Sequence, residues 1–324
     1  PPRPMNAPAD TAFLAKERAR AKWVALAAAL AILCFIAASL IAGPALSDVR
    51  SGSSADLLVA YHDDSSRAVV IPSLLRALSF LLMGVPLLYL FQAARAREPR
   101  VRREFLGFYI LGPALIAAQF VLLSTALVDV GDDFVAQAET VAESPSDDPD
   151  ADVDEDSPRE NLADDLLQDS SAVSTAQVIS LVGFLCFGIA LFYTGLWSMR
   201  TGLLSRFNAT FAMALGVVCA IPFFSQLGAF GAVIWMAFLA VFFARSPERR
   251  PPAWTEGRAV PWPKPGEAPA EGGTVEGSGR EVSERGLPEA EPNPGEPAGG
   301  ADAEEPPARG ETQGQRRRKR KRRD

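Results

Sequence analysis

Arg76 is the one charged residue inside the long apolar segments of this 324-residue chain, and amide side chains accompany it at Gln119, Asn208 and Gln226. An ionisable or amide group at membrane depth is costly, and it usually faces a bundle interior, a substrate path or an ion path. Arg76 has two interpretations: its guanidinium extends to the outer headgroups, or it faces the bundle and pairs with a carboxylate or backbone carbonyl. We favour the first, and we predict Arg76, Gln119 and Gln226 as polar site residues within the membrane.

Alternate carboxylates of the kind that begins a calcium loop occur at Asp150, Asp152 and Asp154. The rest of the loop pattern fails, because Glu155 stands where glycine is needed and Asn161 where a bidentate glutamate is needed. Residues 129–169 hold sixteen carboxylates against Arg159 alone, a net charge of −15. A specific calcium site, loose screening by divalent cations and a solvated, self-repelling spacer all stay open, and the pattern favours the spacer. The three aspartates are weak metal candidates.

The chain ends in eight consecutive cations: Arg316, Arg317, Arg318, Lys319, Arg320, Lys321, Arg322 and Arg323. Near an anionic leaflet each contributes about 1 kcal/mol, and the phosphates of RNA attract them equally well. Residues 265–315 are rich in Pro, Gly and Glu, which predicts a linker that does not fold. We favour non-specific binding of anionic lipids or RNA over a merely solubilising run or a dedicated partner.

Most enzyme chemistry is excluded by what the sequence lacks. His62 is the single histidine, it lies outside the apolar segments, and we expect it at the surface. Catalysis that needs two histidines or a buried serine–histidine pair is therefore unavailable. No P-loop, glycine-rich dinucleotide fingerprint or zinc-ligand spacing occurs. We predict no catalytic residue, no cofactor and no enzymatic activity.

The elements that would position these groups are apolar segments, which the average composition hides. The chain is 48% hydrophobic with a mean hydropathy of only +0.09, because apolar and charged blocks alternate. About 20 apolar residues span the hydrocarbon core of a bilayer. The last block, residues 207–244, has no charged residue or histidine over 38 positions, so as one helix it would be roughly 57 Å long. Pro222 interrupts it, and we predict a helical hairpin.

Within that hairpin, Ala212, Gly216 and Ala220 recur at four-residue spacing. Small residues at this spacing let two membrane helices approach closely, and we expect a packing seam. Toward the end of the acidic segment, Leu162, Leu166 and Leu167 alternate with aspartates. That pattern indicates a short amphipathic helix at the membrane surface.

We therefore predict an all-α, polytopic membrane helix bundle with six transmembrane helices. These are residues 23–43, 69–92, 105–128, 176–199, 207–224 and 227–244. The other segments are a basic N-terminus (1–22), an outer loop (44–68), a basic cytoplasmic loop (93–104), a disordered acidic outer loop (129–175), a cytoplasmic loop (200–206), an outer turn (225–226) and a disordered cytoplasmic tail (245–324). A cleaved signal peptide is the alternative for 23–43, but 21 residues exceed the usual apolar core of such peptides.

Charge predicts the orientation of this bundle. The short connection 93–104 carries five arginines, which the positive-inside rule places in the cytoplasm. Six crossings then put both termini inside, in agreement with Arg245, Arg249 and Arg250 directly after the last apolar block. Beyond them, Trp254 and Trp262 either rest at the headgroup level or pack on the bundle.

Three stretches resemble an uncharacterised group of multi-pass membrane proteins from high-GC Gram-positive bacteria. They are MRTGLLSRF at residues 199–207, RPPAWTEGRAVPWP at 250–263 and LYLFQAARAR at 88–97. The resemblance covers roughly residues 23–263. It implies a place in the plasma membrane, and it implies no activity.

The leading functional hypothesis is a non-enzymatic plasma-membrane anchor or interaction scaffold. It would present an acidic face outside and a basic, anion-binding arm inside. A transporter or channel is the alternative, because six crossings accompany the polar trio. A further alternative is a membrane-protein biogenesis factor whose basic end touches ribosomal RNA. The lipid bilayer is the one partner predicted in all three.

Overall fold

The computed structural model describes residues 11–47, 49, 53–142, 157–246 and 249–262, and each regular element in them is a helix. In chain order these are α1 (Thr11–Ala45), α2 (Ser54–Asp63), the π-helix η1 (Ser66–Val70), α3 (Ile71–Arg97), the 3₁₀-helix η2 (Arg103–Phe105), α4 (Leu106–Ala142), α5 (Ser157–Asp169), α6 (Ser171–Thr201), α7 (Arg206–Ala220), the 3₁₀-helix η3 (Pro222–Phe224), α8 (Ser225–Ala244) and α9 (Pro252–Glu256). The predicted all-helical fold is confirmed for these residues.

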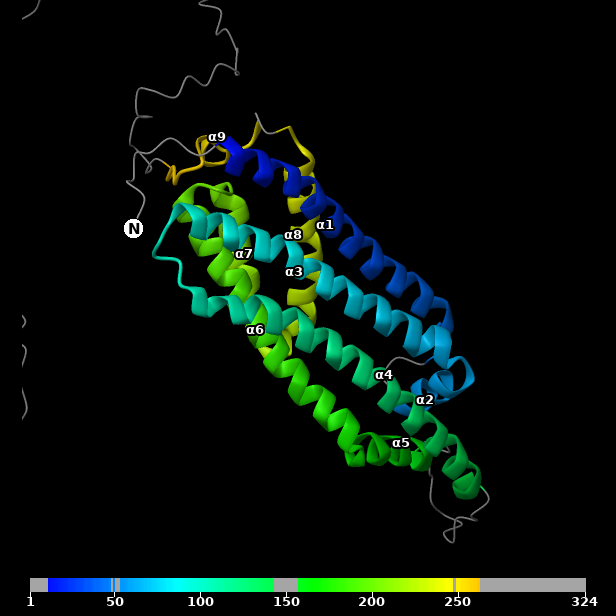
Figure 1. Ribbon diagram of the computed structural model, residues 1–324. Helices are drawn as coiled ribbons and strands as arrows, with labels where there is room; N and C mark the ends of the chain where they lie inside the picture. The colour runs from blue at the N-terminus through cyan, green and yellow to red at the C-terminus, as the bar shows by residue number, and fades with distance from the viewer. Residues whose placement is uncertain (1–10, 48, 50–52, 143–156, 247–248, 263–324) are drawn as a thin grey trace, which may run out of the picture. The chain divides into compact units, whose positions relative to one another are not determined.

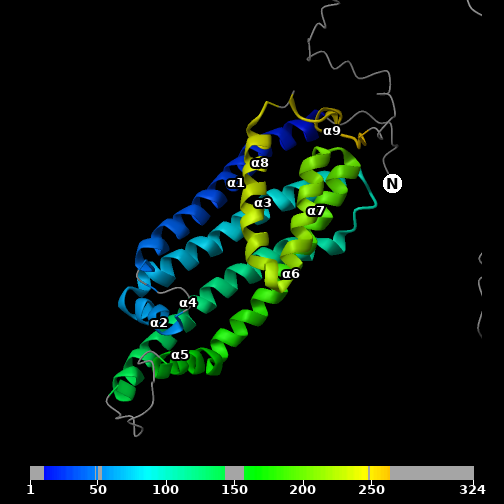
Figure 2. The same cartoon turned by 180° about the vertical axis from the view of Figure 1, so that it is seen from behind.

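Six of these helices form a closed ring. α1 packs on α3, α3 on α4, α4 on α6, α6 on α7 and α7 on α8, while α8 returns to α1 (Figure 1). Figure 2 shows α8 from the other side, between α1 and α7. α3 also contacts α6 across the ring. Buried aromatic side chains fill the interior: Phe80 packs edge-on against Phe184 and Phe187, with ring centroids 5.8 and 5.6 Å apart.

Five helical segments of the described residues are long and apolar enough to cross a membrane. They are Leu14–Ala45, Ser66–Arg97, Arg103–Thr140, Ser171–Thr201 and Pro222–Ala244. These segments indicate a membrane-embedded protein. α7 has 15 residues, about 22 Å of helix against a hydrocarbon core of roughly 30 Å. The sixth crossing therefore stays a prediction.

α7 and α8 form an antiparallel helical hairpin, as the uncharged block predicted. Near the turn, Gly228 packs on the backbone of Cys219. At the far end of α7, the indole Nε1 of Trp235 donates to the carbonyl of Asn208 at 3.1 Å. Gly228 at the start of α8 thus lies against the end of α7, and Trp235, further along α8, lies against the start of α7. The two helices therefore run in opposite directions.

The turn of this hairpin lies earlier than predicted. Residues 225–226 were expected to form it, yet they begin α8, and the chain reverses at 221–224. Ile221 is extended, and Pro222 begins η3 because its fixed φ suits a first helical position and it has no N–H to donate. The hydroxyl of Ser225 donates to the Pro222 carbonyl at 2.9 Å. The polar pair therefore belongs to the first turn of α8.

The small residues of α7 form a packing seam, and their main partner is α6. A Cβ placed on Gly188 would lie 2.5 Å from the carbonyl oxygen of Gly216 and 3.3 Å from the Cβ of Ala220. One placed on Gly195 would lie 2.5 Å from the carbonyl oxygen of Ala209. The backbones of α6 and α7 thus touch where side chains are smallest, which confirms the predicted seam.

A smaller apolar cluster lies at the end of the bundle that carries α2 and α5, hereafter the α5 end. It includes Leu58 of α2, Val130 and Phe134 of α4, and Ala163 of α5. Val130, Phe134 and Ala138 recur every four residues and are buried, so α4 continues to Ala142 rather than ending near residue 128. The prediction of a disordered loop over 129–175 is therefore wrong for its described residues.

The predicted amphipathic helix in this segment is confirmed as α5. It supplies a helix cap for α2: the Glu160 carboxylate accepts hydrogen bonds from the Ser53 hydroxyl at 3.0 Å and from the backbone N–H groups of Ser54 and Ala55. The Ser54 N–H in particular holds the pKa of Glu160 below its usual value. A carboxylate at a helix N-terminus is also stabilised by the helix dipole, so the cap ties α5 to α2.

The structure predicts that Gly188→Ala lowers the unfolding temperature of the detergent-solubilised protein. The new methyl group meets the Gly216 carbonyl oxygen, and the helices must move apart at a cost of about 1–3 kcal/mol. Gly107→Ala is the matched control, because a Cβ there has no neighbour within 4 Å. We expect the control to unfold at or slightly above the wild-type temperature. Equal unfolding temperatures for both variants would contradict the seam.

Candidate functional site

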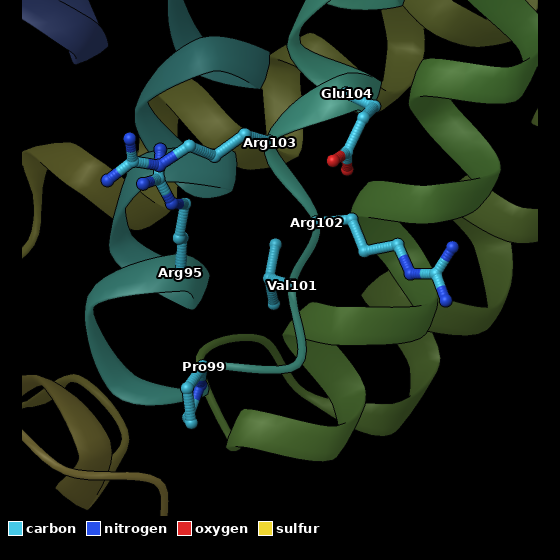
Figure 3. Close-up of a pocket in the computed structure, with 6 residues that line it drawn as sticks. All are labelled: Arg95, Pro99, Val101, Arg102, Arg103 and Glu104. Atoms are coloured by element: carbon cyan, nitrogen blue, oxygen red, sulfur yellow. The ribbon is translucent and has the colours of Figure 1, made fainter. Parts of the chain in front are cut away.

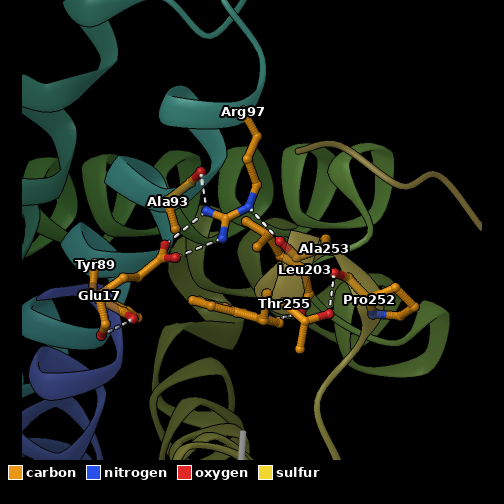
Figure 4. A network of polar contacts seen from close by, with 9 residues as sticks. Glu17, Tyr89, Ala93, Arg97, Leu203, Pro252, Ala253 and Thr255 are labelled. Atoms are coloured by element: carbon orange, nitrogen blue, oxygen red, sulfur yellow. Dashed lines mark hydrogen bonds and ion pairs between the residues drawn. The ribbon is translucent and has the colours of Figure 1, made fainter. Parts of the chain in front are cut away.

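A buried ion pair joins α1 to α3 at the end of the bundle that carries α9, hereafter the α9 end. Arg97 donates from Nη1 to Glu17 Oε1 and from Nη2 to Glu17 Oε2, both at 2.8 Å (Figure 4). The two side chains are 0% and 7% exposed. Arg97 Nη1 also donates to the Ala93 carbonyl at 2.9 Å, and the Tyr89 hydroxyl donates to the Glu17 carbonyl at 3.0 Å. The pair is bidentate, which is the strong geometry for arginine and carboxylate.

Residues 249–262, hereafter the strap, pack against this ion pair. Arg97 Nε donates to the Ala253 carbonyl at 3.0 Å (Figure 4). The Arg97 guanidinium lies over the Trp254 ring, 5.1 Å from its centroid. The indole of Trp254 stacks on Tyr89 with ring centroids 5.7 Å apart. Its Nε1 donates to the Leu203 carbonyl at 2.8 Å. One tryptophan of the strap therefore contacts both the ion pair and the connection between α6 and α7.

That connection is shaped to receive the strap. Gly202 ends α6 with a φ of +72°, a conformation that favours glycine. A Cβ there would collide with the Val260 carbonyl, while the Val260 N–H donates to the Thr201 carbonyl at 3.1 Å. Two residues after Gly202, the carbonyl of Leu204 accepts a hydrogen bond from Trp262 Nε1 at 2.9 Å. Glycine thus permits the close approach, and the freed carbonyls after α6 receive the two indoles.

Arg250 fastens the start of the strap to α8. Its Nη2 donates to the Phe243 carbonyl at 2.7 Å and to the Arg245 carbonyl at 3.2 Å. Phe243 lies in the last turn of α8 and Arg245 is its C-cap, so these carbonyls stand where the helix offers no further backbone donors and where positive charge is favoured. Burial lowers the pKa of Arg250.

Two of the three resembling stretches, 199–207 and 250–263, are thus bonded to each other through their described residues. The tryptophans were predicted either to rest at the headgroups or to pack on the bundle, and both donate to the α6–α7 connection. The prediction that the whole of 245–324 is a disordered tail is wrong for the strap, which includes α9. Sequence inspection missed Glu17 and Arg97, because both were read as members of charged, solvent-facing segments.

An open, basic concavity lies beside the ion pair, where α3 connects to α4. It has a volume of about 510 Å³ and is lined by Arg95, Pro99, Val101, Arg102, Arg103 and Glu104. Figure 3 shows the guanidinium groups of Arg95 and Arg103 on one side and Arg102 on the other. The backbone N–H of Arg102 donates to the Tyr193 hydroxyl at 3.1 Å. The arginines of the predicted basic loop are therefore split: Arg97 is buried, and these three line an accessible surface.

A polar pocket lies at the turn of the α7–α8 hairpin. Its volume is about 290 Å³, and it is lined by Gln119, Leu123, Gln177, Ser180, Leu181, Phe184, Cys219, Pro222, Ser225 and Gln226. Two of the three predicted intramembrane polar residues, Gln119 and Gln226, come together here. Gln119 is 7% exposed and its Oε1 is buried without a hydrogen-bond partner. Gln177 and Ser180 were missed because they flank or begin an apolar block.

Arg76 is the member of the polar trio that does not line this pocket. It is half-buried in α3, and within the described part of the chain it makes neither an ion pair nor a hydrogen bond. Its charge acts on Tyr61 of α2, whose pKa burial raises and Arg76 partly lowers. Arg76 therefore lies toward the α5 end, where the extension of its guanidinium to headgroups stays a prediction.

The remaining predicted sites are distributed as follows. His62 is exposed, as expected, and its Nδ1 lies 2.7 Å from Asp132 Oδ1 of α4. The weak metal candidates Asp150, Asp152 and Asp154 and the basic run 316–323 lie outside the described residues. Among the residues that are described, no group of three or more His, Cys, Asp or Glu side chains has an arrangement suited to a metal ion.

Comparison with known proteins adds no relative. No family model matches the chain, and no match is found among curated proteins or solved structures.

Replacing Arg97 by Met should destabilise the fold by about 3–5 kcal/mol, because the Glu17 carboxylate is left buried without its counter-ion. The strap also loses a hydrogen bond and a cation–π contact, so trypsin should cleave faster after Arg258. Arg100→Met is the matched control, since Arg100 is 85% exposed in the same connection. We expect it to change the free energy of unfolding by less than about 0.5 kcal/mol.

A second variant separates charge burial from packing. Glu17→Leu combined with Arg97→Met removes both charges and should recover part of the lost stability. Thermal unfolding in detergent and mass-spectrometric mapping of the tryptic fragments give the readouts. Unchanged unfolding and unchanged cleavage after Arg258 in R97M would show that the ion pair does not hold the strap.

Proposed function

We propose that the protein is a non-enzymatic anchor or interaction scaffold of the plasma membrane that presents its basic C-terminal arm, Arg316–Arg323, in the cytoplasm. The observation that carries the proposal is the strap, which fixes the point at which residues 263–324 continue from the bundle. Two indole hydrogen bonds, from Trp254 and Trp262, and one from the buried guanidinium of Arg97 hold the strap on the bundle. A segment that only connected the arm to the last helix would not need them.

The position of the strap supports a shared side for the two ends of the chain. Arg97 binds Glu17, near the start of α1, and Ala253 of the strap, so both segments meet at the α9 end. The arginines of the basic concavity lie at the same end. By the positive-inside rule this end faces the cytoplasm. The concavity would then add to the attraction of the arm for anionic surfaces.

A transporter or channel has weaker support from this geometry. Its favourable observation is the pocket that joins Gln119 and Gln226. Against it, Arg76 lies elsewhere, and the interior of the helix ring is filled by side chains such as Phe80, Phe187 and Leu191, which are fully buried. A biogenesis factor that touches ribosomal RNA differs from the scaffold only in what the arm binds, so the same experiment addresses both.

The arm is tested by replacing residues 316–323 with eight glutamines in the full-length protein. The wild-type protein in nanodiscs should bind vesicles that contain phosphatidylglycerol, and the variant should lose at least about tenfold in affinity. The binding should weaken as salt rises from 50 to 200 mM, because the attraction is electrostatic.

Zwitterionic vesicles are the control surface, and RNA of mixed sequence is the competing ligand. Vesicle binding that is the same in both proteins removes the proposed role of the arm. Binding to RNA and co-sedimentation with ribosomes, both lost in the variant while vesicle binding is absent, would favour the biogenesis factor over the scaffold.

The orientation is tested by two reporter fusions. Green fluorescent protein placed after Asp324 should fluoresce, since it folds in the cytoplasm, whereas alkaline phosphatase at that position should be inactive. The same reporters inserted after Asp150, in the acidic connection, should give the opposite pattern. Phosphatase activity at the C-terminus would mean that the chain crosses the membrane an odd number of times from a cytoplasmic start.

A further inference from the structure

The polar pocket at the hairpin turn contains a buried polar atom that the chain itself does not satisfy. Gln119 is more than nine-tenths buried, and its Oε1 has no partner. A buried carbonyl without a hydrogen bond costs about 1–3 kcal/mol, so such an atom usually serves a ligand or an ordered water. Trp197, Ser198 and Arg250 also carry buried atoms without partners, but none of them lines this pocket.

The lining of the pocket defines the chemistry of its ligand. Three amides, from Gln119, Gln177 and Gln226, and the hydroxyl of Ser180 offer both donors and acceptors. Asp, Glu, Lys, Arg and His are absent from the lining. An ion would therefore meet no counter-charge in this lining, which disfavours charged ligands.

The volume and the apolar lining of the pocket limit which neutral ligand it can hold. A volume of about 290 Å³ equals roughly ten water molecules at 30 Å³ each, which suits a group of about a dozen non-hydrogen atoms. Phe184 and Leu123 form an apolar wall beside the amides. A ring that has hydroxyls at its edge and carbon–hydrogen faces, as in a sugar, meets both kinds of surface.

We propose that this pocket binds a neutral, hydroxyl-rich group of the sugar or glycerol type. The group reaches it either as a free polyol or as the headgroup of a lipid. Leu181, which lines the pocket, is 48% exposed, and Val178, which follows the lining residue Gln177, is 62% exposed. In a membrane-embedded helix such side chains face lipid, so a headgroup has a direct path to the amides.

The proposal is tested in the full-length protein purified in a detergent that has no sugar, such as a dimethylamine oxide. Octyl glucoside should raise the unfolding temperature of the wild type more than octyl phosphocholine does, because only the glucoside matches the amides. Gln119→Leu, which removes the orphaned carbonyl, should unfold at or above the wild-type temperature without ligand. Its affinity for octyl glucoside should fall roughly tenfold, as expected for one lost hydrogen bond.

Gln137→Leu is the matched control, since Gln137 is an exposed glutamine of the same helix, α4, and we expect its response to octyl glucoside to equal that of the wild type. Free glucose and glycerol distinguish the sources. Protection by these polyols identifies a soluble ligand, and protection by octyl glucoside alone identifies a lipid headgroup.

Equal protection by octyl glucoside in the wild type and Q119L would overturn the proposal, as would equal protection by the phosphocholine detergent. If Q119L does not fold, Gln177→Leu takes its place, because that residue lines the pocket and is exposed. These outcomes do not depend on the basic arm, so they stand apart from the scaffold function.

Discussion

The bidentate pair between Arg97 and Glu17 is the contact on which the α9 end depends. A guanidinium that is fully buried must be paired, and each of its nitrogens has a partner here. Those partners come from α1, from α3 and from the strap, and Glu17 and Ala253 lie 80 and 156 residues from Arg97 in sequence. The buried Arg97 guanidinium therefore holds the start of α1 and the strap after α8 in fixed positions relative to each other.

Aromatic packing joins this ion pair to the closure of the helix ring. Tyr89 of α3 contacts Phe243 of α8 edge-on at 5.4 Å and stacks on Trp254 at 5.7 Å. Phe243 in turn packs on Trp254 at 5.8 Å. The strap thus rests on the same side chains that seat α8 between α1 and α7. Release of the strap would expose part of that contact, so ring closure and strap binding reinforce each other.

The sequence predicts the parts of this structure that depend on local pattern. The apolar segments predict the long helices, Pro222 predicts the interruption between α7 and α8, and the spacing of Gly216 and Ala220 predicts the close packing of α7. Prediction fails where the composition of a segment suggests one structure and the spacing of its apolar residues specifies another. The acid-rich segment after residue 128 suggested a loop, although Val130, Phe134 and Ala138 carry a helical stripe that continues α4. The turn was assigned to the polar pair 225–226 rather than to the proline before it.

Contacts between residues far apart in the sequence cannot be predicted from local pattern. Charge counting treats Arg97 and Arg102 alike, yet only the fold shows that one is buried against Glu17 and the other lines an open surface. The strap was assigned to a disordered tail, and only the fold shows that the carbonyls of Leu203 and Leu204 accept hydrogen bonds from its two indoles. For the polar trio, Gln119 and Gln226 meet only because α7 folds back at Pro222.

The two buried polar features differ in a way that separates architecture from function. Around Arg97 each nitrogen is satisfied within the chain, as expected of a group whose role is to hold segments together. Gln119 has instead kept an acceptor open, in a pocket large enough for more than one water. The incomplete site is therefore the better place to look for a ligand, and the complete one for the origin of the fold.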